Sequence, residues 1–356
     1  MFSIYDAFKR KIADEEISTP LAAILALTEL IENSDAGTMF ELVKALNDGA
    51  EALKKQASNT ISVNAGCELF IAFVTLFPHD SDNFTDLKKE LIRQGQNYAA
   101  EALTYRKKIA ELAFGFIKDG SVILTHSYSR VVMQTLLLAH KRKRFSVFVT
   151  EARPRGLGIK TAEALTAAGV PSTVILDSAV AYVMDKVDFV LVGSEAVVES
   201  GGLVNAVGSN QIAIIARAAN KPFYALAESY KFHRLFPLSQ YDLPSHNSKI
   251  LSFPSILHAN SSSMNTSSPS SPSQNESNYP TGGQPERVPL RITQEQISKN
   301  NPDVDYTRSL LLASTAPEMT VLILRRRPDL ISLVFSDVGS LTPEGVSQYL
   351  VGMFAG

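Results

Sequence analysis

Apolar residues recur at three- and four-residue spacing through the first third of the chain. The spacing is clearest in two runs, which are Ile24, Leu27, Leu30 and Ile31, and then Phe40, Val43 and Leu46. This is the period of an amphipathic helix, and Pro20 suits the first turn of one such helix. Residues 67–77 are apolar nearly all round, which predicts a buried helix, and residues 84–117 read as one long helix. We therefore expect a helical N-terminal domain over residues 1–118.

The pattern changes after residue 118. Short runs rich in β-branched and other apolar residues now alternate with helix-like stretches. The predicted strands are 121–125, 145–149, 173–176, 187–192, 222–227 and 331–335, and the helices between the first four are 129–141, 159–168 and 178–184. This alternation predicts βαβ units, and continuously apolar strands indicate a parallel sheet that is covered on both faces. We therefore expect an α/β fold in which residues 119–356 form a Rossmann-like, doubly wound parallel sheet domain.

One segment interrupts the predicted α/β domain. Residues 260–284 hold nine serines, four asparagines and three prolines. Such a stretch cannot bury enough apolar surface to offset the conformational entropy that ordering it would remove. The composition therefore predicts a disordered surface insertion over about 245–300.

Charge and hydropathy exclude several classes of function. Lys and Arg total 34 against 36 Asp and Glu, for a net charge of −2, whereas a protein held on nucleic acid by phosphate neutralisation is normally basic. No apolar run is long enough to span a bilayer, and the N-terminus lacks the apolar region of a signal peptide. We expect a cytosolic protein without a nucleic-acid or membrane partner.

Motifs for metals and common cofactors are also missing from the sequence. Cys67 is the single cysteine, so neither an intramolecular disulfide nor a CxxC metal site can form, and the six histidines show no HExxH spacing. No GxGxxG follows the first predicted strand, and no GxxxxGK[ST] occurs. We expect no metal and no cofactor, and Cys67 is interpreted as a core thiol because it lies in the predicted buried helix.

Polar side chains gather just after the predicted strands. In a doubly wound sheet the carboxyl ends of the strands meet at one edge, where ligands bind. The candidate binding residues at this edge are His126, Ser127, Ser129, Arg130, Arg153, Asp177, Ser178, Glu195, Asn205, Ser209 and Lys231. No catalytic residue is assigned, because His126 and Ser127 are neighbours whose side chains point to opposite sides of a strand end and so cannot form a Ser–His pair.

These residue types indicate a small phosphorylated polyol as the ligand. Arg130, Arg153 and Lys231 are suited to neutralise a phosphate. Ser129 and Ser209 stand at predicted helix N-termini, where free backbone N–H groups favour anions. Carboxylates at the strand ends would accept hydrogen bonds from sugar hydroxyls. The alternative interpretation is that all of these side chains are helix caps and solvated strand ends.

Several segments, in this order along the chain, resemble the alpha-subunit family of eukaryotic translation initiation factor 2B. They are ILTHSYSRVV (123–132), VTEARPRGLG (149–158), residues 173–216, residues 221–244, NPDVDY (301–306) and FSDVGSLTPEGVS (335–347). The resemblance covers most of the chain outside the serine-rich insertion, and residues 173–244 are its most specific part. The wider family includes sugar-phosphate isomerases that act on ribose 1,5-bisphosphate and methylthioribose 1-phosphate.

The resemblance implies that isomerase chemistry is lost while a vestigial sugar-phosphate pocket remains. The place of the isomerases' catalytic cysteine is held by Ser127, and that of their aspartate by Glu195. A serine without a base does not supply a thiolate, and an acid longer by one methylene shifts the geometry of proton transfer. Arg153 and the pair Asp177 and Ser178 match the family pattern.

The function implied by the resemblance is regulatory and not enzymatic. An alpha subunit forms a homodimer that bridges two sets of beta, gamma, delta and epsilon subunits into a decamer. The epsilon subunit, with gamma, carries guanine-nucleotide exchange on initiation factor 2. Alpha, with beta and delta, senses the phosphorylated alpha subunit of that substrate, which the helical N-terminal region would face. The alternatives are an active sugar-phosphate isomerase and a free-standing sugar-phosphate sensor.

One segment departs from the family pattern. The family runs from an NPxxDYT-like segment almost directly into Pro-x-x-Ile-x-Leu, but here residues 308–327 separate the two. They contain the apolar run TVLIL, which an exposed loop would not favour. We interpret this unplaced segment as either a lineage-specific insertion or a retained intron.

Overall fold

The computed structural model describes residues 2–57, 59–78, 83–246, 250–251, 293–309 and 330–354. These divide into two compact units. The main unit comprises residues 1–246 and 303–356, and the second unit comprises residues 247–302. Most of the predicted serine-rich insertion and of the unplaced segment 308–327 lies outside the described residues.

The second unit contains one described helix, α11 (Gln294–Asn300), inside the range predicted to be a disordered insertion. Its N-terminus is a capping box, in which Thr293 accepts a hydrogen bond from the backbone N–H of Gln296 and the Gln296 side chain accepts one from the backbone N–H of Thr293. This satisfies two backbone donors that are otherwise unpaired at a helix start. The bounds of the predicted insertion stay a prediction.

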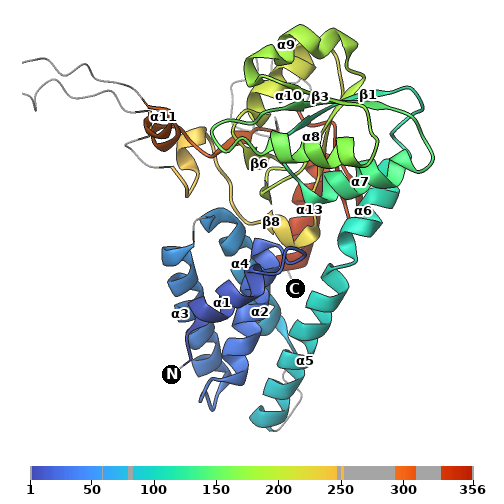
Figure 1. Cartoon of the computed structure of the whole chain (residues 1–356). Helices are drawn as coiled ribbons and strands as arrows, with labels where there is room; N and C mark the ends of the chain where they lie inside the picture. Colours follow the sequence, from blue (N-terminus) through green and yellow to red (C-terminus); the bar gives the residue numbers. More distant parts are fainter. Residues whose placement is uncertain are drawn as a thin grey trace, which may run out of the picture. The chain divides into compact units, whose positions relative to one another are not determined.

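The main unit begins with six helices, as the apolar spacing predicts (Figure 1). They are α1 (Ile4–Ile12), α2 (Thr19–Glu32), α3 (Met39–Gln56), α4 (Thr60–Leu76), α5 (Phe84–Ala102) and α6 (Tyr105–Phe114). Helix α2 is central and packs against α1, α3, α4 and α5. Helix α4 approaches α2 so closely that a Cβ at Gly66 would clash with the backbone oxygen of Pro20.

The long helix predicted over 84–117 is in fact two helices. The break falls at Leu103 and Thr104, where the Thr104 hydroxyl donates to the carbonyl of Glu101 at 2.7 Å and its N–H bonds the same oxygen at 2.8 Å. A threonine hydroxyl that bonds a backbone carbonyl three residues earlier competes with regular helical hydrogen bonding. Helix α6 lies before the predicted domain boundary at 118/119 but packs against α7 and β10, and the boundary itself stays a prediction.

A seven-stranded sheet forms the centre of the α/β part, which confirms the predicted fold class. Its strands are β1 (Val122–His126), β2 (Ser146–Thr150), β3 (Ser172–Ile175), β4 (Phe189–Val192), β7 (Phe223–Leu226), β10 (Leu333–Ser336) and β11 (Gly339–Leu341). Their order is β11-β10-β7-β4-β1-β2-β3, and every pair is parallel except β10 with β11.

Helices cover both faces of this sheet. They are α7 (Arg130–His140), α8 (Gly158–Ala167), α9 (Val180–Val183), α10 (Ser209–Ala218) and α13 (Pro343–Phe354). Successive residues of β1 enter different cores, because side chains alternate along a strand. Ile123 packs in the core with α6, α7 and α8, whereas Leu124 packs in the core with α9, α10 and α13.

A second sheet of four short strands was not predicted. Its strands are β5 (Ala196–Val198), β6 (Leu203–Ala206), β8 (Phe232–His233) and β9 (Val304–Thr307), in the order β8-β5-β6-β9. These strands have two to four residues each, too few to show a clear alternation. The sheet matters for function because it fixes the residues that follow β4.

Candidate functional site

The candidate site lies where the order of strand addition changes direction in the main sheet, since β2 and β3 follow on one side of β1 and β4 and β7 on the other. Strand β1 is flanked by β2 on one side and by β4 on the other, which is the switch point at which doubly wound sheets bind ligands. Here Gly193, directly after β4, touches Ser129, the N-cap of α7, so closely that a Cβ at Gly193 would clash with the Ser129 side chain. The glycine therefore permits the two strand ends to meet.

His126, the last residue of β1, is buried and fully hydrogen-bonded. Its Nε2 lies 2.9 Å from the carbonyl oxygen of Val207, and its Nδ1 lies 2.6 Å from Oγ1 of Thr150. Because a carbonyl only accepts, Nε2 carries the proton and Nδ1 accepts from the threonine hydroxyl. Burial lowers the pKa of His126, although Asp177 opposes this effect. The ring is thus a neutral structural group with no nitrogen free to act as a base.

Two strand ends carry residues in the left-handed backbone region. Ser127 has φ of 62° after β1 and Ala152 has φ of 60° after β2, a conformation that non-glycine residues adopt only where their surroundings impose it. The carbonyl of Ser127 accepts the Thr161 hydroxyl at 2.7 Å. Asp177 accepts the backbone N–H of Ala152 at 2.9 Å and of Arg153 at 2.8 Å. Asp177 therefore shapes the loop after β2.

Glu195, two residues after Gly193, is tied to the helical region. Its Oε2 accepts the side-chain amide of Asn59, the N-cap of α4, at 2.7 Å. The hydroxyl of Ser62 lies 3.3 Å from the same oxygen and 3.2 Å from the Glu195 carbonyl. On its other side, Oε1 accepts Arg155 at 3.3 Å. The carboxylate thus sits at the start of α4, where the helix dipole favours negative charge.

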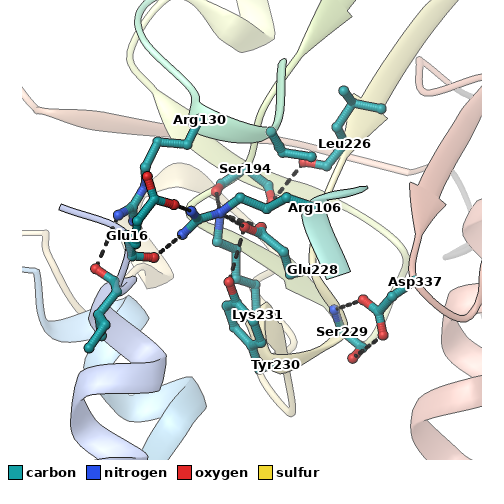
Figure 2. Close-up of polar contacts among 12 residues, drawn as sticks. Glu16, Arg106, Arg130, Ser194, Leu226, Glu228, Ser229, Tyr230, Lys231 and Asp337 are labelled. Carbon is teal, nitrogen blue, oxygen red and sulfur yellow. Dashed lines mark hydrogen bonds and ion pairs between the residues drawn. The ribbon is translucent and has the colours of Figure 1, made fainter. Parts of the chain in front are cut away.

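A buried ionic cluster lies at the end of β7 (Figure 2). The Glu228 side chain is 2% exposed and lies 2.7 Å from Lys231 Nζ and 3.2 Å from Arg106 Nε. Lys231 also donates to the carbonyl of Ser194, beside Glu195, at 2.9 Å. Burial by itself raises the pKa of Glu228, but the two cations outweigh it and hold the pKa at about 2. Lys231 therefore reaches the strand ends while paired with a buried carboxylate.

The N-terminus of α10 is held by a buried carboxylate from β9. Oδ2 of Asp305 accepts the backbone N–H of Gly208 at 2.7 Å and of Asn210 at 3.0 Å. Burial raises the pKa of Asp305 to about 7, against these two hydrogen bonds. Beside it, the Asn205 amide donates to the Ser209 hydroxyl at 2.9 Å. These contacts fix the turn that enters α10.

The structure brings most of the predicted site residues together at the strand ends. His126, Ser127, Ser129, Asp177, Glu195, Asn205, Ser209 and Lys231 all lie at the ends of β1, β3, β4, β6 and β7. Three others point elsewhere. The Arg153 side chain is 62% exposed and pairs with Glu151. Ser178 is exposed, and Arg130 donates to the backbone carbonyls of Glu15 and Ile17.

Several residues of this network were not predicted. They are Asn59, Ser62, Arg106, Arg155, Glu228 and Asp305. Arg155 and Asp305 lie inside segments that carry the family resemblance, so those segments contained the signal. Asn59 and Arg106 come from the helical region, and no local pattern links them to strand ends that follow more than a hundred residues later.

A separate cavity of about 550 Å³ lies between α2, α4 and α5. Its wall is mainly apolar and aromatic and includes Phe70, Phe73 and Tyr98, with Met353 from α13. None of the predicted site residues lines it. The site at the strand ends therefore rests on the geometry of its own side chains.

Within the part of the chain that the structure describes, the strand ends hold no nucleophile that a base activates. Among the described residues, no hydrogen bond joins the Ser127 hydroxyl to a histidine or a carboxylate, and no cluster of three His, Cys, Asp or Glu side chains could hold a metal ion. Within the same ranges, none of the helices is both long and apolar enough to cross a membrane.

Known proteins resemble this chain, some over nearly its whole length and others over about half of it. A Dictyostelium discoideum protein named translation initiation factor eIF2B subunit alpha is 37% identical over 344 residues, which cover 96% of this chain and 93% of that protein. A ribose 1,5-bisphosphate isomerase of Archaeoglobus fulgidus is 35% identical over 165 residues, or 46% of this chain and 53% of the isomerase.

Solved structures share the fold. A chain of the tetrameric eIF2B beta2–delta2 complex from C. thermophilum matches with a TM-score of 0.66 and 17% identity, over 99% of this chain and 96% of that one. The sequence pattern of the initiation factor 2 subunit family matches residues 13–314. With the fold, the order of the strand-end motifs and these matches in agreement, the chain belongs to the initiation factor 2 subunit family.

Proposed function

We propose that this chain is a regulatory, non-catalytic subunit of a cytosolic translation initiation factor, the guanine-nucleotide exchange factor for initiation factor 2. It acts as a homodimer that bridges the other subunits into a decamer, and it helps to sense the phosphorylated substrate. The strand ends retain a small sugar-phosphate site. Membership of the family, and full-length similarity to a protein named as an alpha subunit, support this role.

One observation carries the non-catalytic part of the proposal, which is that Glu195 is already engaged. A proton-transfer group must be within reach of the proton that it moves and free to accept it. Glu195 instead accepts Asn59 at 2.7 Å and Arg155 at 3.3 Å. Ser127 lacks a base that would activate its hydroxyl as a nucleophile, because the neighbouring His126 uses both ring nitrogens in structural hydrogen bonds.

The retained ligand site is supported by the residues at the switch point. Lys231 offers a cationic group at the end of the η3 turn (Ser229–Lys231), and its side chain is 13% exposed. Ser129 stands at the start of α7, where backbone N–H groups attract anions, whereas at the start of α10 the N–H groups of Gly208 and Asn210 already donate to Asp305. Together these groups are suited to a phosphate with attached hydroxyls.

The first experiment is native mass spectrometry of the complex that a tag on this chain recovers from its own cells. We expect two copies of the chain together with pairs of four other subunits. In parallel, the purified chain is incubated with ribose 1,5-bisphosphate and with methylthioribose 1-phosphate, and we expect no isomerised product. A bare dimer would overturn the proposed assembly, and turnover of either substrate would move the assignment to a sugar-phosphate isomerase.

A further inference from the structure

The turn between α1 and α2 is held by two arginines, one on α6 and one on α7. Arg106 on α6 donates to the Glu16 carboxylate at 2.9 Å and to the Glu16 carbonyl at 2.6 Å. Arg130 on α7 donates to the carbonyls of Glu15 and Ile17. Three successive carbonyls of residues 15–17 are thus bound by guanidinium groups.

Arg106 is shared between this turn and the buried Glu228. Its side chain is 7% exposed, and its contact with Glu228, at 3.2 Å, is longer than both contacts with Glu16. Glu228 receives its second cation from Lys231 at 2.7 Å and a hydrogen bond from the Tyr230 hydroxyl at 3.0 Å. The cluster therefore forms a chain of charges that runs Lys231, Glu228, Arg106, Glu16.

We propose that this chain of charges is a relay through which an anion at the strand ends loosens the turn at residues 13–17. The inference rests on the proposed function, since it takes the strand ends to bind a phosphorylated ligand. A phosphate that draws the Lys231 ammonium away leaves Glu228 buried with one cation. A buried carboxylate without sufficient partners is strongly unfavourable. Arg106 then moves fully to Glu228 and gives up Glu16.

The relay gives the ligand site a means to regulate the helical region. The turn connects α1 to α2, and α2 is the helix on which α1, α3, α4 and α5 pack. A change in how the turn is held therefore reaches the element around which the helical region is built. Glu16, whose side chain is 77% exposed, can turn to water when Arg106 leaves it, so the open state carries no buried unpaired acid.

Hydrogen exchange of the whole chain tests the relay without a ligand. The amides of Asp14, Glu16 and Ile17 are hydrogen-bonded within the turn and serve as reporters. Lys231→Met should raise their exchange about tenfold, which corresponds to the loss of one hydrogen bond to a charged group. The double variant Lys231→Met with Glu228→Gln should restore slow exchange, because no buried carboxylate remains to attract Arg106.

A matched control uses Lys143, another lysine that bonds carbonyls of the main unit. It donates to Phe114 at 2.8 Å and also to Ile117, near the end of α6. Lys143→Met should leave exchange at residues 13–17 unchanged. The relay is overturned if Lys231→Met leaves the reporters as slow as in the wild type, or if the double variant exchanges as fast as the single one.

A second arm separates the relay from the proposed ligand site. Ribose 1,5-bisphosphate is titrated into the wild-type chain by calorimetry, and exchange is measured at the saturating concentration. Binding with faster exchange at residues 13–17 supports the relay, and binding without that change overturns it. No binding would remove the proposed sugar-phosphate site, and the variants alone would then decide whether the charges are coupled.

Discussion

Replacing Asp305 by asparagine should remove a pH dependence from the stability of the chain. The group's pKa is raised from 3.8 to about 7 by burial, so the native state keeps a proton that the unfolded chain has already released. Stability from this group is therefore present below about pH 4 and is lost as the pH rises toward 7. Asparagine has nearly the same shape and still offers an oxygen to the N–H groups of Gly208 and Asn210, but it never ionises.

The size of this loss of stability follows from the part of the Asp305 pKa shift that falls between pH 5 and pH 8. Between pH 5 and about pH 7 the native state holds a proton that the unfolded state has released, so each pH unit lowers the free energy of unfolding by about 1.4 kcal/mol. The wild type should thus lose about 3 kcal/mol of unfolding free energy from this group between pH 5 and pH 8. This is an upper value, because water and side-chain relaxation reduce the effect of burial.

Urea unfolding at pH 5 and pH 8 measures the effect as a difference between variants, so that other titrating groups cancel. Asp303→Asn is the matched control, since the same change is made two residues earlier on a side chain that is 61% exposed. We expect the free energy of unfolding of Asp305→Asn, taken relative to that of the wild type, to be higher at pH 8 than at pH 5. Equal differences at both pH values would show that Asp305 ionises normally and would refute the reasoning.

Three further changes test other parts of the structure. Glu195→Asp withdraws the carboxylate from Asn59 and should cost about 1–2 kcal/mol in urea unfolding, without any gain of ribose 1,5-bisphosphate turnover; an unchanged stability would contradict the tether. Gly66→Ala should destabilise the chain by about 2 kcal/mol or more because its Cβ meets a backbone oxygen of α2, whereas Gly352→Ala on α13, where the space is open, should stabilise by up to about 1 kcal/mol. Burial raises the pKa of Cys67 from 9.0 to about 12, which lowers the thiolate fraction at pH 8 about a thousandfold. A thiol reagent should therefore react about a thousandfold more slowly with the native than with the urea-unfolded chain, and equal rates would mean that the thiol is accessible.

The fold followed from local sequence patterns wherever an element was long enough to display one. The first two strands were placed within one residue of β1 and β2, because buried strands between helices read as continuous apolar runs. The second sheet was missed because β5 and β8 have only three and two residues, and the apolar runs of β6 and β9 are interrupted by Asn205 and Asp305. The break between α5 and α6 depends on one threonine, Thr104, whose hydroxyl bonds the carbonyl of Glu101, and the apolar spacing continues across it.

The candidate site was located from topology, but the partners of its residues were not. Strand ends meet at the switch point in any doubly wound sheet, so their proximity could be predicted. What each side chain does there depends on distant groups. Glu195 was interpreted as a ligand for hydroxyls, and the structure shows it bound to Asn59, which lies 136 residues away in sequence. Such pairings are set by tertiary packing and leave no local pattern.

The long sequence separation of these contacts also affects how the chain is made. Arg106 leaves the ribosome 122 residues before its partner Glu228, a delay of about 6–25 s at ordinary rates of synthesis. During that interval the helices are already present, while a guanidinium destined for the interior has only Glu16 to pair with. The helical region therefore reaches its final stability only once the residues that follow β7 have been translated.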